Sequence, residues 1–79
     1  MAAAEPNWGE VRDRMLALTL KQLKPIKALF NGCLGGVSTK GAIVGEMVGQ
    51  MQHWWHHCDW QGKNKVQHVM RELRRAEVA

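Results

Sequence analysis

The sequence predicts an all-α fold: a small bundle of three to four helices built around a helix-loop-helix core. Apolar residues recur at intervals of three and four along four segments, and residues that favour helix caps precede most of these segments. No segment alternates apolar and polar residues as a β-strand does. A length of 79 residues suits one domain with a small core. We therefore expect residues 1–6 to be a flexible lead-in and residues 7–79 to form a single domain.

The first helix is expected over residues 8–18. Asn7 is a suitable N-cap, and Glu10 lies where a glutamate side chain can reach back to the cap. One apolar stripe follows at helical spacing: Trp8, Val11, Met15 and Leu18.

The second segment begins at Thr19, because Thr19 and Gln22 have the spacing of a capping box. Its apolar stripe consists of Leu20, Leu23, Ile26 and Phe30. Pro25 leaves two possibilities open. Either the helix continues through the proline with a kink, or residues 19–24 form a looser turn and Pro25 is the first helical residue. Asn31 and Gly32 are expected to end this element.

A loop over residues 33–38 leads to a long third helix, with Ser38 as its N-cap and its end near His57. Two adjacent apolar faces follow: Ile43, Met47, Met51 and Trp54 on one, and Val44, Val48 and Trp55 on the other. After a break at residues 59–62, a fourth helix is expected over residues 63–76. Its buried stripe is Val66, Val69, Met70 and Leu73, and its C-terminal end carries Arg71, Arg74 and Arg75. Cations at that end interact favourably with the negative end of the helix dipole.

The net charge of +4 favours an anionic partner. Five basic residues occur from residue 14 to residue 45 without any acidic residue: Arg14, Lys21, Lys24, Lys27 and Lys40. Two interpretations remain open. The stretch is either a solvated face that keeps the protein soluble or a surface that binds the phosphates of nucleic acid.

A glycine-rich loop, residues 35–41, runs into the third helix, whose N-terminus offers free backbone N–H groups to an anion. Lys40 lies in the first turn, where a cation opposes the dipole, so a phosphate between the two would explain it. On this interpretation, Lys40→Glu is neutral or slightly stabilising in the free protein. The pattern lacks the spacing and the preceding strand of a P-loop. A plain connecting loop is the alternative.

Gly41, Gly45 and Gly49 recur every four residues along one side of the third helix. Each costs about 1 kcal/mol relative to alanine in a helix interior. The row is therefore expected to be a packing face for another helix, and contact with a nucleic-acid backbone is the alternative.

A histidine and cysteine cluster raises the question of a metal site: His53, His56, His57, Cys58 and the distant Cys33. Zinc sites typically have two compact ligand pairs separated by a loop, and Cys33 stands alone. We therefore expect no metal and no other cofactor, with the histidines on the exposed flank of the helix end. Among the four tryptophans, Trp54 is expected in the core. Trp55 and Trp60 are candidates for partial exposure and for stacking on bases.

Catalysis is not expected, because neither Ser38 nor Cys58 has a motif that would supply an ordered base. The N-terminal residues lack the basic start and the apolar core of a signal peptide. No run approaches the roughly 18 apolar residues of a membrane span. Two cysteines are too few for a disulfide scaffold. We expect a monomer in an intracellular, reducing compartment, with free thiols and no membrane association.

Residues 19–24, Leu34 and residues 37–48 resemble the SAP domain. That family has two helices joined by a loop and binds chromosomal DNA, often AT-rich scaffold-attachment DNA. The preceding helix and the basic final helix, with its Arg-Glu-Leu-Arg-Arg sequence, are similar to the extended four-helix version at the N-terminus of PIAS/Siz-type SUMO ligases. The core of the match covers residues 19–51, under half the chain.

The resemblance implies a SAP-like helix-loop-helix core in a non-catalytic module of a larger nuclear, chromatin-associated protein. Such a module binds duplex DNA mainly through phosphate contacts. By position, Ser38 would cap the helix, and Lys40 would be the loop lysine that meets phosphate. Thr39 and Gly41 replace a glycine and a second lysine of the family pattern.

Together with the charge pattern, the resemblance gives these candidate DNA-binding residues: Lys21, Lys24, Lys27, Ser38, Thr39 and Lys40. The alternative function is a protein-interaction domain that holds a partner helix or tail on an apolar, tryptophan-rich face.

Overall fold

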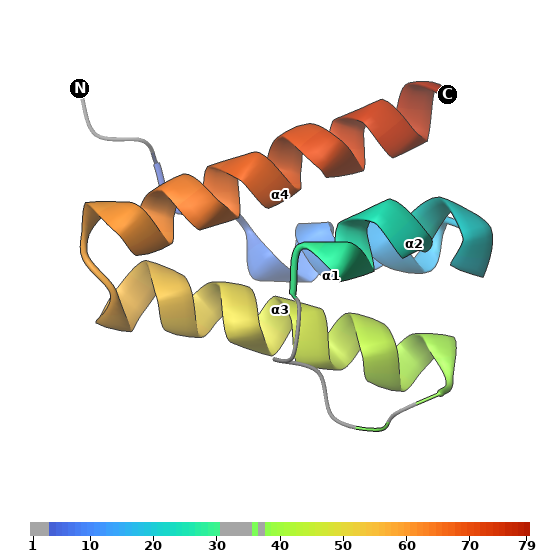
Figure 1. The fold of residues 1–79 in the computed structure, drawn as a ribbon, viewed down its shortest axis with the longest axis horizontal. Coiled ribbons are helices and arrows are strands. Elements are labelled where there is room, and N and C mark those ends of the chain that lie inside the picture. The colour runs from blue at the N-terminus through green and yellow to red at the C-terminus, as the bar shows by residue number, and fades with distance from the viewer. Residues whose placement is uncertain (1–3, 31–35, 37) are drawn as a thin grey trace.

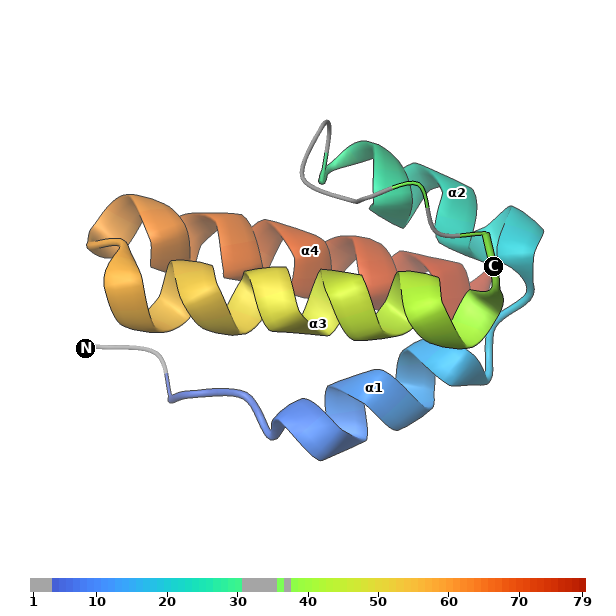
Figure 2. The same cartoon turned by 90° about the horizontal axis from the view of Figure 1, so that it is seen from below.

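The computed structural model describes residues 4–30, 36 and 38–79. This part of the chain forms four helices: α1 (Trp8–Leu16), α2 (Leu20–Ala28), α3 (Lys40–His57) and α4 (Trp60–Val78). No described residue lies in a strand, which confirms the all-α prediction. Figures 1 and 2 show that α3 and α4 diverge from their connecting turn, with α1 on one side of the pair and α2 on the other. α1 packs against α3, and α2 packs against α4.

Side-chain caps start the first two helices as expected. The Asn7 side chain accepts a hydrogen bond from the backbone N–H of Glu10 at 3.1 Å. Thr19 and Gln22 form a complete capping box, with bonds of 2.8 and 3.1 Å. The helix α2 then continues through Pro25, so the alternative of a loose turn over residues 19–24 is wrong. The capping box explains this start, because it satisfies two backbone donors before the proline is reached.

Two boundaries before α4 differ from the expected ones. The helix α1 ends at Leu16 rather than Leu18, because the backbone N–H of Leu18 turns back to the carbonyl of Met15 at 3.1 Å. Thr39 rather than Ser38 caps α3, and its hydroxyl accepts from the N–H of Ala42 at 3.3 Å. The predicted ending at residues 31–32 and most of the predicted loop over residues 33–38 lie outside the described residues.

The fourth helix is longer than predicted at both ends. It starts at Trp60 rather than residue 63, because the Asp59 side chain caps it by accepting from the N–H of Gln61 at 3.1 Å. Gly62 lies in the first turn of α4, close to the end of α3. A Cβ atom there would lie 2.2 Å from the backbone oxygen of Trp54. Asp59 and Gly62 are therefore parts of a tight helix-helix corner, not of a long break.

The core is apolar and follows the predicted stripes closely. The buried residues are Val11, Met15, Leu18, Leu23, Ile26, Phe30, Ile43, Val44, Met47, Val48, Met51, Trp54, Trp55, Val66, Val69 and Leu73. Phe30 stacks on Trp54 with a centroid separation of 5.2 Å, which joins α2 to α3. Leu20 departs from its stripe and is 52% exposed at the first position of α2. Trp8 and Met70 are half-buried against the core.

Candidate nucleic-acid interface

The three lysines of α2 lie on the outer side of the bundle. Lys21 and Lys24 are exposed and Lys27 is half-buried, while Leu23 and Ile26 between them face the core. A spacing of three residues rotates each lysine by about 60° relative to the one before, so they wind slowly across one face. Among the described residues, no carboxylate pairs with any of the three. This face therefore keeps its positive charge.

The ammonium group of Lys40 lies against the end of α1 rather than beside its own helix terminus. Its Nζ donates a hydrogen bond to the backbone carbonyl of Leu16 at 3.3 Å, and the side chain is half-buried. Leu16 is the last residue of α1, where carbonyls lack helical partners and the dipole is negative. Lys40 thus stabilises the end of α1 and holds the start of α3 beside the α1–α2 turn.

The N-terminus of α3 lies at the same end of the bundle as the N-terminus of α2 (Figures 1 and 2). Ser38 and Thr39 are exposed there. The Thr39 hydroxyl caps Ala42, and its carbonyl accepts from the N–H of Ile43 at 2.9 Å. The first-turn donors of α3 before Ala42 have no partner inside the helix. The structure thus places the starts of α2 and α3 at one end of the bundle (Figures 1 and 2), although α3 packs mainly against α1 and α4.

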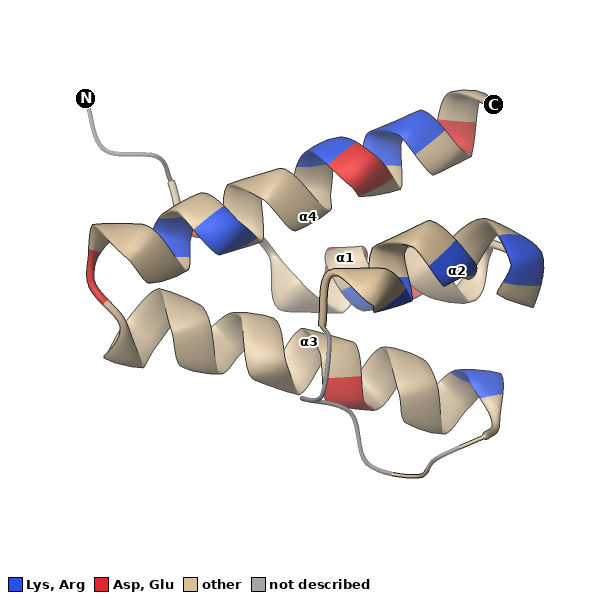
Figure 3. Cartoon of the chain, in the orientation of Figure 1, with Lys and Arg blue, Asp and Glu red and all other residues tan. Residues whose placement is uncertain are grey.

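The acidic residues with an ion pair in the described ranges are Glu5, Glu72 and Glu77, and none of them pairs with a lysine of α2. Figure 3 shows the basic residues mainly along α2 and α4, with Lys40 and Glu46 as the charged residues of α3. Glu77 binds Arg14 through two hydrogen bonds of 2.6 and 2.8 Å. This bond holds the pKa of Glu77 below its ordinary value and raises that of Arg14.

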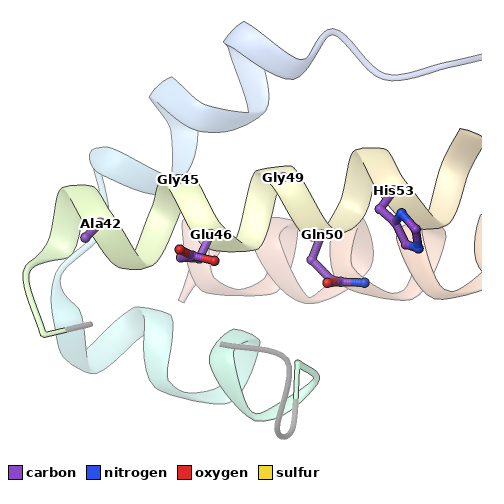
Figure 4. A pocket seen from close by; sticks show the side chains of 6 residues that line it. All are labelled: Ala42, Gly45, Glu46, Gly49, Gln50 and His53. Atoms are coloured by element: carbon purple, nitrogen blue, oxygen red, sulfur yellow. The ribbon is translucent and has the colours of Figure 1, made fainter. Parts of the chain in front are cut away.

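The glycine row of α3 is not a packing face, which corrects the prediction. Among the described residues, nothing lies within 4 Å of a Cβ placed at Gly41, Gly45 or Gly49. The reason is helical geometry. The two apolar faces of α3 occupy one half of the helix, and the glycines fall on the other half. Figure 4 shows the shallow surface beside the row, with Glu46, Gln50 and His53 along it.

The histidines lie near the end of α3, as expected. The rings of His53 and His57 stack with centroids 5.0 Å apart, and His56 Nε2 lies 2.7 Å from a carboxylate oxygen of Glu5. Glu5 also accepts from the Trp8 indole at 2.8 Å, and this bond is the main reason why its pKa is lowered. In the described ranges, no three histidine, cysteine or acidic side chains gather as metal ligands.

The four tryptophans differ in how far their side chains are exposed to solvent. Trp54 is in the core as predicted, and Trp55 is buried beside it with 8% of its surface exposed. Trp60 is 66% exposed at the start of α4. Trp8 contacts the Trp55 ring edge-to-face at 6.4 Å. Of the two candidates for base stacking, only Trp60 has an accessible ring face among the described residues.

No described helix combines the length and the apolar composition that a membrane crossing requires. Comparisons of the chain with models of protein families, with curated protein sequences and with solved structures gave no match.

Proposed function

We propose that this chain is a non-catalytic module that binds duplex DNA through phosphate contacts from α2 and from the N-terminus of α3. The observation that carries the proposal is the lysine face of α2. Lys21, Lys24 and Lys27 have no carboxylate partner among the described residues, although the chain has acidic residues that pair elsewhere. Unpaired lysines on a rigid helix can replace the counterions of a phosphate backbone, which favours binding through counterion release.

The dimensions of this face suit one DNA strand. From Lys21 to Lys27 the helix rises about 9 Å at 1.5 Å per residue. A strand of B-DNA advances about 3.4 Å per phosphate along the helix axis, so the face spans roughly three phosphates. The N-terminus of α3 supplies backbone donors at the same end of the bundle, with Ser38 and Thr39 beside them.

Lys40 has a different part in this proposal from the one that the SAP-like pattern implies. Its bond to the Leu16 carbonyl holds the start of α3 against the end of α1, at the end of the bundle where α2 begins (Figure 2). A phosphate at the α3 N-terminus would meet the backbone N–H groups first and would share the Lys40 ammonium with the end of α1. The proposed contacts are to the phosphate backbone of the DNA and not to its bases. We therefore propose weak base readout, with the shape of the DNA groove as the main source of any preference for AT-rich DNA. A larger nuclear protein is the proposed setting.

The test is the salt dependence of binding to a labelled duplex, measured by fluorescence anisotropy. Lys24→Gln should lower affinity and reduce the slope of log affinity against log salt by about one unit. Lys63→Gln is the matched control, because Lys63 lies near the start of α4, at the far end of the bundle (Figure 3). Equal slopes for the two variants would contradict the proposal.

A further inference from the structure

A groove of about 670 Å³ lies between the C-terminal end of α2 and the middle of α4. The apolar side chains that line it are Leu29, Trp54 and Val69. Val69 is 1% exposed and Trp54 is 7% exposed, so these two form the floor. The volume is within the range of about 300–1,000 Å³ that is typical of ligand pockets.

The charged side chains that line the groove all come from α4 and carry positive or titratable nitrogen groups: Lys65, His68 and Arg71. Lys65 Nζ lies 5.3 Å from the centre of the Trp54 ring, so a cation stands directly over the apolar floor. The nearest acidic residue along α4 is Glu72, and its carboxylate pairs with Arg75 at 3.3 Å. The described lining of the groove therefore contains no acidic side chain.

We infer that this groove binds a short acidic protein segment that carries a large apolar anchor, such as leucine or phenylalanine flanked by aspartate and glutamate. The anchor would cover Trp54 and Val69, and the flanking carboxylates would pair with Lys65 and Arg71. Duplex DNA would meet the cations but has no side chain to fill the floor. An uncharged apolar helix would fill the floor but would leave the cations desolvated without partners.

The groove is distinct from the proposed DNA face. Leu29 is on the side of α2 that faces α4, whereas Lys24 points away from the core on the outer side. The inference does not require the DNA proposal, and the two can fail separately.

The experiment uses a fluorescein-labelled peptide of about twelve residues, rich in aspartate and glutamate, with phenylalanine and leucine four residues apart. Binding to Lys65→Glu/Arg71→Glu should be at least about tenfold weaker than to the unmodified chain. The matched control is Arg12→Glu/Arg74→Glu, which makes the same charge change at two exposed arginines that do not line the groove. The control should lose less than about threefold, because neither arginine lines the groove and exposed charges are screened by solvent and salt. Circular dichroism melts confirm that both variants are folded.

Two variant peptides separate the contribution of the apolar anchor residues from that of the acidic residues. Replacing phenylalanine and leucine by alanine should abolish binding, and replacing the acidic residues by their amides should weaken it strongly. In methyl NMR spectra of the unmodified chain, the peptide should shift the Leu29 and Val69 signals. Equal losses in the two charge variants, or binding that ignores the anchor residues, would overturn the inference. Displacement of the peptide by duplex DNA, with shifts of the same methyl signals, would assign the groove to nucleic acid instead.

Discussion

The Lys40 ammonium donates a hydrogen bond to the carbonyl of Leu16 at 3.3 Å, so the first residue of α3 caps the last residue of α1. This bond joins residues 24 positions apart in the sequence. It holds the α3 N-terminus against the end of α1, shortly before α2 begins, and the proposed DNA-binding surface depends on that position.

The first prediction concerns this bond. Lys40→Met should destabilise the free protein by about 1 kcal/mol, the usual contribution of a cation at a helix C-terminus. Lys40→Glu should cost more, because a carboxylate would face the α1 carbonyls. The bond reverses the expectation drawn from the α3 dipole alone, under which glutamate was neutral or favourable. Urea melts of these variants and of Lys24→Met, as an exposed control, measure the free energy of unfolding. A Lys40→Met variant as stable as the control would show that the bond contributes nothing.

The second prediction concerns the glycine row. Gly45→Ala/Gly49→Ala should stabilise the protein by roughly 1–2 kcal/mol, because each alanine improves helix propensity by about 0.8–1.0 kcal/mol. Both positions have open space around a new Cβ among the described residues. Thermal melts measure the gain, and anisotropy on duplex DNA should show unchanged affinity. A stabilised variant with weaker DNA binding would place this row in the DNA interface.

The third prediction is the opposite response at Gly62. Gly62→Ala should destabilise the protein by about 1–3 kcal/mol, because its Cβ would lie 2.2 Å from the Trp54 backbone oxygen. That atom is part of α3, so α3 and α4 must move apart to make room. Near-ultraviolet circular dichroism should report the loss through Trp54 and Trp55. A variant with unchanged stability would mean that the corner accommodates a side chain.

The fourth prediction concerns the stability of the fold at low pH. Arg14 holds the pKa of Glu77 below its ordinary value. A carboxylate with a lowered folded-state pKa stabilises the protein above its unfolded-state pKa, and this stability disappears as the pH falls through the folded-state pKa. The native chain should therefore lose more stability between about pH 6 and about pH 3 than Glu77→Gln does. Glu46→Gln, at an exposed carboxylate without a described ion pair, should follow the native chain. Parallel curves for Glu77→Gln and the native chain would contradict this account.

Local patterns allowed most of the helices and the core to be predicted. Capping chemistry and apolar spacing act over one or two turns, so the Thr19 capping box and the two apolar faces of α3 could be read directly. The α3–α4 corner was missed because Gly62 resembles a helix breaker in sequence. Its role depends on the approach of Trp54, a contact that forms only when two helices pack.

The candidate site was predictable in composition but not in arrangement. The acid-free run of lysines was visible in the sequence, and the structure places Lys21, Lys24 and Lys27 on one helix. The partner of Lys40 could not be predicted, since no local rule links it to Leu16. The basic groove over Trp54 was also missed, because its apolar lining comes from Leu29, Trp54 and Val69, which are far apart in the sequence.

We propose that duplex DNA binds to α2 and the start of α3. An NMR titration of the isotopically labelled chain with a short duplex, at two salt concentrations, tests it most directly. We predict amide shifts concentrated in residues 19–28 and 38–42, with affinity that falls steeply at the higher salt concentration. Shifts confined to the groove around Leu29 and Val69, or binding that does not respond to salt, would contradict it.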